Sequence, residues 1–180
     1  MQVQIKMINK NKKKLRAGFT LIEVLVACSI ISLSMFALMQ TAENGIRLSN
    51  EALTKSQASL LLEEGAESVK SIRDNSWTTI ANLNLNTPYH LFFNTTTKVW
   101  VLDTSTTNLS GSIPSYPIDS VFDRTVTFYS IGRDATSGDI VAEGGNPDLG
   151  TKKVTITVTW NSKKVVNSKS LSFYISNIFN

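Results

Sequence analysis

One carboxylate in this chain lies inside an otherwise apolar segment. Residues 19–39 (FTLIEVLVACSIISLSMFALM) carry a single charged side chain, Glu23, which is the fifth residue after Gly18. On insertion scales, a charged residue at the centre of a membrane helix costs about 2.5–3.5 kcal/mol. Either another group neutralises this charge, or the segment is not the membrane helix that its hydropathy indicates.

Residue types that commonly perform catalysis are scarce. The chain has one histidine, His90, and one cysteine, Cys28. A Ser/His/Asp triad would depend entirely on His90, no GxSxG motif is present, and one His with one Cys cannot complete a zinc site. We therefore expect His90 to be a sheet residue with a hydrogen-bonded partner, and we predict neither enzymatic activity nor a cofactor.

Acidic residues gather in 132–150 (GRDATSGDIVAEGGNPDLG), which its glycines and aspartates predict to be a long loop. Asp134, Asp139, Glu143 and Asp148 are weak candidates for calcium ligands, because calcium prefers carboxylate oxygens. Their spacing matches no EF-hand, so a solvated acidic loop is the favoured interpretation and no metal is predicted.

The elements that position Glu23 follow from charge and hydropathy. Residues 1–18 are polar and basic, and 19–39 provide 21 positions with a single charge. At about 1.5 Å per residue these form a helix of about 31 Å, which is enough to cross a bilayer core. The stretch exceeds the roughly 7–15 residues of a secretory h-region, so we predict that it stays in the membrane.

The helix is predicted to continue through 40–74, which contains no proline and presents a charged face. Leu62, Ala66, Val69 and either Ile72 or Arg73 recur at spacings of three and four residues, which predicts an amphipathic helix with one apolar face. Asp74 and the following asparagine favour a turn that ends it.

Residues 75–180 are predicted to form a β-rich head. Lys153–Trp160 (KVTITVTW) alternates strictly between apolar residues and threonine, and 165–176 returns as the second strand of a hairpin. Further strands are predicted at 88–93, 97–103 and 124–131. The predicted fold class is α+β, with one long helix packed on a small antiparallel sheet.

The charge distribution argues against a nucleic-acid partner. The net charge is +4, but six of the 18 Lys and Arg residues lie in 1–18, so the remaining 12 face 14 Asp and Glu. The basic character therefore belongs to the N-terminal segment, and the body lacks the basic stripe that phosphate binding requires.

Gly18 followed by FTLIEVLVA after a basic leader resembles the class III signal of type IV pilins and pseudopilins. The resemblance covers residues 13–39 and includes the glycine, the phenylalanine after it and the glutamate at the fifth position beyond the glycine. It implies cleavage between Gly18 and Phe19 by an aspartyl prepilin peptidase, N-methylation of Phe19, and pairing of Glu23 with the N-terminal amine of a neighbouring subunit.

The resemblance also implies partners and a location. The partners are the prepilin peptidase, other pilin or pseudopilin subunits, the inner-membrane assembly platform and the lipid bilayer. The mature chain would wait as a single-pass protein of the inner membrane and then enter an extracytoplasmic filament, a type IV pilus or a type II secretion-like pseudopilus. Because the chain has one cysteine, it lacks the cysteine pair of many major pilins, which favours a minor pilin or minor pseudopilin.

A second interpretation is a membrane-anchored or lipidated binding domain that does not polymerise. LVAC at 25–28 fits the lipobox of bacterial lipoproteins, in which Cys28 would become the lipidated N-terminus. Two features oppose it, because Glu23 would lie inside the h-region and the apolar SIISLSMFALM follows Cys28 where a polar tether is expected.

Overall fold

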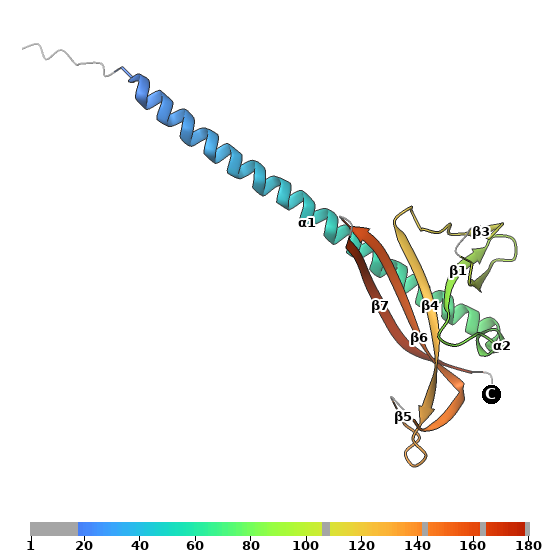
Figure 1. Ribbon diagram of the computed structural model, residues 1–180. Helices are drawn as coiled ribbons and strands as arrows, with labels where there is room; N and C mark the ends of the chain where they lie inside the picture. The colour runs from blue at the N-terminus through green and yellow to red at the C-terminus, as the bar shows by residue number, and fades with distance from the viewer. Residues whose placement is uncertain (1–17, 106–108, 142–143, 163–164, 179–180) are drawn as a thin grey trace, which may run out of the picture. The chain divides into compact units, whose positions relative to one another are not determined.

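The computed structural model describes residues 18–105, 109–141, 144–162 and 165–178, and Figure 1 draws its helices and strands. The predicted leader lies outside the described residues apart from Gly18, and so does the calcium candidate Glu143. The chain divides into two compact units, Met1–Ser49 and Asn50–Asn180, and helix α1 (Leu21–Asn75) contributes residues to both.

The part of α1 in the first unit begins with an apolar stretch, residues 21–39, whose single charged side chain is Glu23. Within the described residues, α1 is the one helix that is long and apolar enough to cross a membrane, with a mean hydropathy of 2.3 over an 18-residue window. No side chain of that window is buried inside the chain. The predicted long N-terminal helix is therefore confirmed, and no described residue covers the apolar surface of its first part.

The part of α1 in the second unit is amphipathic and packs on the sheet. Leu62, Ala66 and Val69 are buried, as their spacing predicted, and of the two alternatives at the end of the pattern Ile72 is the buried one. Gly65 lies on the same face, and a Cβ there would come within 3.2 Å of the Ile156 side chain, so the glycine allows the helix to approach the sheet closely. A short helix, α2 (Trp77–Ala81), follows with its Ile80 buried, and the sequence analysis did not predict it.

The strands of the second unit form one antiparallel sheet, and its strands β4, β6 and β7 lie side by side in Figure 1. Its order is β2-β1-β4-β6-β7, with β3 added to β1 and β5 added to β4. The predicted strands are confirmed: 88–93, 124–131 and 153–160 have longer bounds, 97–103 has shorter bounds, and 165–176 is unchanged. These bounds are β1 Pro88–Asn94, β2 Val99–Asp103, β3 Ser112–Ile113, β4 Phe122–Arg133, β5 Ile140–Val141, β6 Asn146–Ser162 and β7 Val165–Ser176.

The core lies between α1 and one face of this sheet. Val154, Ile156, Val158 and Trp160 of β6 are buried, while the threonines between them are only half-buried on the opposite face. Period-two alternation therefore placed this strand correctly. Each fully buried Val, Ile or Leu contributes about 1.5–3 kcal/mol, so this face is the main stabilising contact of the head.

The predicted loop at 132–150 is wrong at both ends, while residues 134–139 lie outside any strand, as expected. Strand β4 continues to Arg133 and β6 already begins at Asn146, with Arg133 paired to Asn146 beyond an irregularity at Ser130/Ile131. The glycines suggested a loop, but Gly132 lies in strand β4. It allows the backbone of Gly144 to come close, since a side chain at Gly132 would overlap the Gly144 carbonyl oxygen. Here glycine marks a close approach of two backbones and not an irregular segment.

Candidate processing and assembly site

Gly18 and Phe19 lie before the first turn of α1. Neither belongs to a helix or strand, and the Phe19 side chain is 86% exposed. A Cβ at Gly18 would meet no atom within 4 Å. The fold of the chain therefore places no steric demand on Gly18, and any requirement for glycine here arises from a molecule that acts on this segment.

Glu23 lies in the first turn of α1 and contacts Thr20, the residue before the helix. The Thr20 backbone N–H donates to Glu23 Oε2 at 2.8 Å, and the Thr20 hydroxyl donates to the same oxygen at 2.9 Å. A carboxylate at the third helical position commonly binds back to the residue before the helix in this way. The sequence analysis missed Thr20, although the T-x-x-E spacing was a signal for it.

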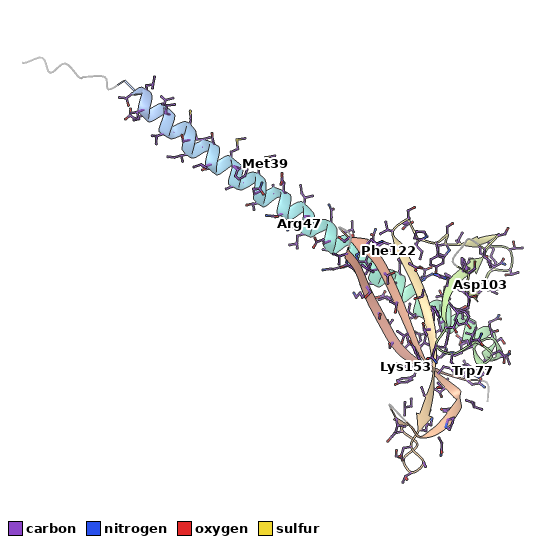
Figure 2. The ribbon with its side chains drawn as sticks, in the orientation of Figure 1. Met39, Arg47, Trp77, Asp103, Phe122 and Lys153 are labelled. Atoms are coloured by element: carbon purple, nitrogen blue, oxygen red, sulfur yellow. The ribbon has the colours of Figure 1, made fainter. Side chains whose placement is uncertain are left out.

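The apolar stretch of α1 that contains Glu23 has no partner among the residues that the structure describes. In Figure 2 the Met39 side chain points away from α1, and it is 62% exposed. The hydroxyls of Ser29, Ser32 and Ser34 donate to the carbonyls four residues before them, each at 2.8 Å. Because these bonds satisfy the hydroxyls internally, the helix can enter hydrocarbon or pack on other helices without unpaired hydroxyl donors.

Cys28 lies inside α1 with its side chain exposed. It has no disulfide partner, since the chain contains no second cysteine. On the helix surface it is one more small, weakly polar residue of the apolar segment.

His90 has the partner that the sequence analysis expected. Its Nε2 lies 2.9 Å from Asp123 Oδ1, and the His90 side chain is 7% exposed. The Tyr116 ring packs edge-on against the imidazole, with 4.4 Å between ring centroids. Because His90 lies in β1 and Asp123 in β4, the pair joins these two strands, which supports a structural contact.

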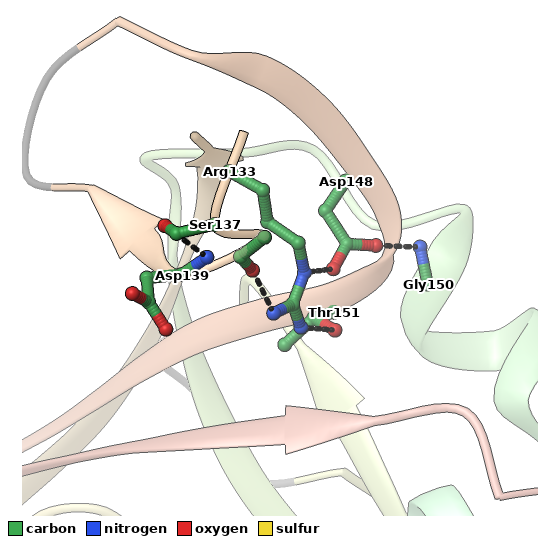
Figure 3. Close-up of polar contacts among 7 residues, drawn as sticks. Arg133, Ser137, Asp139, Asp148, Gly150 and Thr151 are labelled. Atoms are coloured by element: carbon green, nitrogen blue, oxygen red, sulfur yellow. Dashed lines mark hydrogen bonds and ion pairs between the residues drawn. The ribbon is translucent and has the colours of Figure 1, made fainter. Parts of the chain in front are cut away.

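The acidic residues near the β4–β6 connection bind protein groups. Arg133 Nε donates to Asp148 Oδ2 at 2.6 Å, and Figure 3 shows this pair beside Thr151. The hydrogen bond from Arg133 lowers the pKa of Asp148, and the backbone N–H of Ser137 likewise lowers the pKa of Asp134. Within the described ranges, no three His, Cys, Asp or Glu side chains come together to hold a metal ion, so the calcium candidates, Asp139 included, gain no support.

A buried arginine that the sequence analysis did not single out connects α1 to the sheet. The Arg124 side chain is fully buried, and its Nη1 lies 3.0 Å from Glu64 Oε2 and donates to the Leu61 carbonyl at 3.2 Å. Its guanidinium carbon lies 5.9 Å from the centre of the Trp100 ring. Burial raises the pKa of the nearby Tyr116 hydroxyl, and the charge of Arg124 opposes that rise.

Comparison with protein families matches residues 13–39 to the prokaryotic N-terminal methylation motif. The match includes Gly18, Phe19 and Glu23 and ends where the first apolar stretch of α1 ends. Neither the comparison with curated proteins nor the comparison with solved structures found a match. The matched motif includes the first part of the long helix α1, and an antiparallel sheet follows that helix. The chain therefore carries the signature of type IV pilins and pseudopilins on a pilin-like α+β layout.

Proposed function

We propose that this chain is a structural subunit of a type IV pilus or a type II secretion-like filament. One observation carries the proposal. The matched motif covers Gly18, Phe19 and Glu23, and it includes the start of a helix whose apolar surface has no partner among the described residues. Such a surface is stable only in lipid or against other apolar helices, and a filament core supplies the second environment.

In this proposal residues 1–18 are a leader that prepilin peptidase removes on the cytoplasmic side. Cleavage gives Phe19 a new amine, which is then methylated. Residues 19–39 hold the mature subunit in the inner membrane, and 40–74 link this anchor to the head at 75–180. The assembly platform transfers the subunit from the membrane into the extracytoplasmic filament.

Glu23 is proposed to set the register between subunits. It lies four residues after Phe19, about 6 Å along the helix axis, so the amine of a neighbouring subunit can reach it when two helices pack side by side. An unpaired carboxylate in a dry helical bundle is strongly disfavoured, whereas a paired one favours a single alignment. Before assembly, the two hydrogen bonds from Thr20 satisfy the same oxygen.

The subunit is proposed to be a minor component. The single cysteine excludes the intrachain disulfide that closes the head of many major pilins. The retained Glu23 argues against those tip pseudopilins that lack this residue. A structural role of this kind needs no catalytic group in the head.

The test is the mass of the N-terminal peptide from membrane and sheared-surface fractions. The expected peptide begins at methylated Phe19 and occurs in both fractions. A diacylated chain beginning at Cys28 would instead identify a lipoprotein. An intact leader in every fraction would refute processing and leave a signal-anchored domain.

A further inference from the structure

The face of the sheet opposite the core carries an ordered set of hydroxyl groups. Strands β4, β6 and β7 contribute to it in register, in two rows, Thr127–Thr155–Ser172 and Thr125–Thr157–Ser170. Within each row the threonine of β6 and the serine of β7 bond to each other, with 2.9 Å and 3.0 Å between their hydroxyl oxygens. These side chains are exposed or half-buried, so another molecule can reach this polar face.

The next row on the same face, here called the tyrosine row, consists of Tyr129, Lys153 and Tyr174. Tyr129 of β4 pairs with Lys153 of β6, which is labelled in Figure 2 and pairs in turn with Tyr174 of β7. Adjacent strands lie about 4.7–4.9 Å apart, so the backbones of the two tyrosines are about 9.5 Å apart. Tyr174 is 52% exposed, Lys153 is exposed and Tyr129 is half-buried. The tyrosine row therefore has an aromatic ring on either side of a cation.

Lys153 is a cation without a counter-ion in the described part of the chain. The ion pairs found among those residues do not include it. Its ammonium is not stacked on the tyrosines either, because the cation–π contact in that part of the chain joins Arg124 to Trp100. Lys153 is therefore available to an anionic group of another molecule, and an ammonium binds a carboxylate through charge-assisted hydrogen bonds.

A cavity of about 380 Å³ begins at the tyrosine row. Lys153 and Tyr174 line it, together with Ser130 and the consecutive glycines Gly144 and Gly145. Because glycine has no side chain, its backbone N–H and C=O groups can approach a ligand closely. The volume lies within the range of small-molecule pockets, so the cavity can hold a polar group that extends from a ligand lying along the tyrosine row.

We propose that the tyrosine row and this cavity bind an acidic polysaccharide, with sugar rings against Tyr129 and Tyr174 and a carboxylate bound to Lys153. The C–H groups on the flat side of a pyranose ring are attracted to the negative face of an aromatic ring. The spacing of the two tyrosines is close to the length of two sugar units in an extended β-linked chain, so the unit between them lies over Lys153. The threonine and serine hydroxyls of the neighbouring row can bond to the hydroxyls of the sugars.

The three side chains together favour this ligand over simpler ones. A neutral polysaccharide would leave the ammonium of Lys153 unpaired, and a polyanion without sugar rings would leave both tyrosines uncovered. The inference goes beyond the proposed function, because it concerns the head and does not require that the chain is processed or polymerises.

The experiment measures binding of the full chain, purified in detergent, to three immobilised probes at physiological ionic strength. Polymannuronate is a β-linked polymer of sugar carboxylates, cellohexaose has the same linkage without carboxylates, and polyglutamate has carboxylates without sugars. Polyglutamate also measures any binding by the basic segment 1–18. The affinity for polymannuronate is expected to be at least about fivefold higher than for either other probe, the difference expected when a contributing contact is absent.

Three variants test the roles of the ring and the cation. Tyr174→Ala and Lys153→Gln are each expected to raise the Kd for polymannuronate at least about fivefold, whereas Tyr174→Phe keeps the ring and should stay within about twofold of the wild type. Val166→Ala, at an exposed valine of β7 away from the tyrosine row, is the matched control and should leave the Kd unchanged. Because the substituted side chains are exposed, all these variants should unfold at the Tm of the wild type.

Several results would overturn the inference. Polymannuronate that binds no better than polyglutamate would show that charge alone explains the binding, and equal binding to cellohexaose would show that Lys153 has no part in it. Tyr174→Ala with an unchanged Kd and the Tm of the wild type would exclude the contact with the sugar ring. None of these results bears on the proposed function, which the mass of the N-terminal peptide tests separately.

Discussion

Replacing Glu64 by alanine removes the carboxylate that pairs with the fully buried guanidinium of Arg124. Removal of one partner from a buried ion pair costs about 3–5 kcal/mol, because the other charge stays buried and uncompensated, whereas exposed pairs contribute about 0–1 kcal/mol. Arg124 is fully buried but Glu64 is 46% exposed, so water can partly replace the carboxylate. We therefore expect Glu64→Ala to lower the free energy of unfolding by about 2–3 kcal/mol.

The assay is thermal unfolding of the full chain in detergent, followed by near-ultraviolet circular dichroism of the head. At about 2–4 °C per kcal/mol, Glu64→Ala should lower Tm by about 4–12 °C. Glu67→Ala is the matched control, since its pair with Lys70 joins side chains that are 74% and 44% exposed. Its expected cost is about 0.5 kcal/mol or less.

A double variant tests the cause of this loss. If the penalty comes from the stranded charge of Arg124, Glu64→Ala with Arg124→Met should unfold at a higher temperature than Glu64→Ala alone. Equal Tm values for Glu64→Ala and Glu67→Ala would refute the reasoning. So would a double variant that is no more stable than the single one.

Four further predictions concern processing, filament assembly, the pH dependence of stability and the folding of the head. Gly18→Glu should stop maturation and trap the precursor in the membrane without a loss of folding, whereas Glu23→Gln should mature normally and be absent from the sheared fraction. Because Arg133 lowers the pKa of Asp148, that pair adds stability above about pH 4 that is lost as pH falls further, so Asp148→Asn should lose less Tm than the wild type between pH 6 and pH 3. Residues 50–180 expressed alone should be soluble and β-rich by far-ultraviolet circular dichroism.

Each of these four predictions has a clear contrary result. Maturation of Gly18→Glu at Phe19, or Glu23→Gln in sheared filaments at the wild-type level, would contradict the assigned roles. Parallel loss of Tm on acidification in Asp148→Asn and the wild type would show that the pair does not stabilise the fold. A disordered spectrum for 50–180 would contradict a head that includes the second part of α1. A fragment starting at 75 is a useful comparison, because it lacks the buried face of the helix and should fold poorly.

Local pattern was sufficient for the elements that a short stretch of chain decides by itself. The apolar run from 19 to 39, the three- and four-residue spacing of Leu62, Ala66 and Val69, and the alternation of Lys153–Trp160 all predicted elements that the structure contains. Each signal reflects the positions of apolar side chains along a regular backbone. These positions are set by neighbouring residues, so the sequence carries the signal without reference to distant residues.

Composition misled where pairing with a distant strand decides the backbone. The glycines and aspartates of 132–150 indicated a loop, yet Arg133 pairs with Asn146 and Asp148 is bound to Arg133 inside a continuing ladder. A hydrogen-bonded partner strand can hold glycine and aspartate in a strand although their local β-propensity is low, and local propensity alone does not predict this.

By itself the sequence determined the motif at Gly18–Glu23, the long helix and the strongest strands, because charge, hydropathy and period are properties of neighbouring residues. Only the tertiary structure decided that Arg124 lies against Glu64 and Leu61, about sixty residues earlier in the chain, and that Leu61, Trp100 and Ile113 line one cavity. Alternation with Val126 and Phe128 placed Arg124 on the inner face, but no local rule names the carboxylate that makes its burial tolerable. That partner depends on how closely α1 approaches the sheet, and Gly65 and the packing around it set this distance.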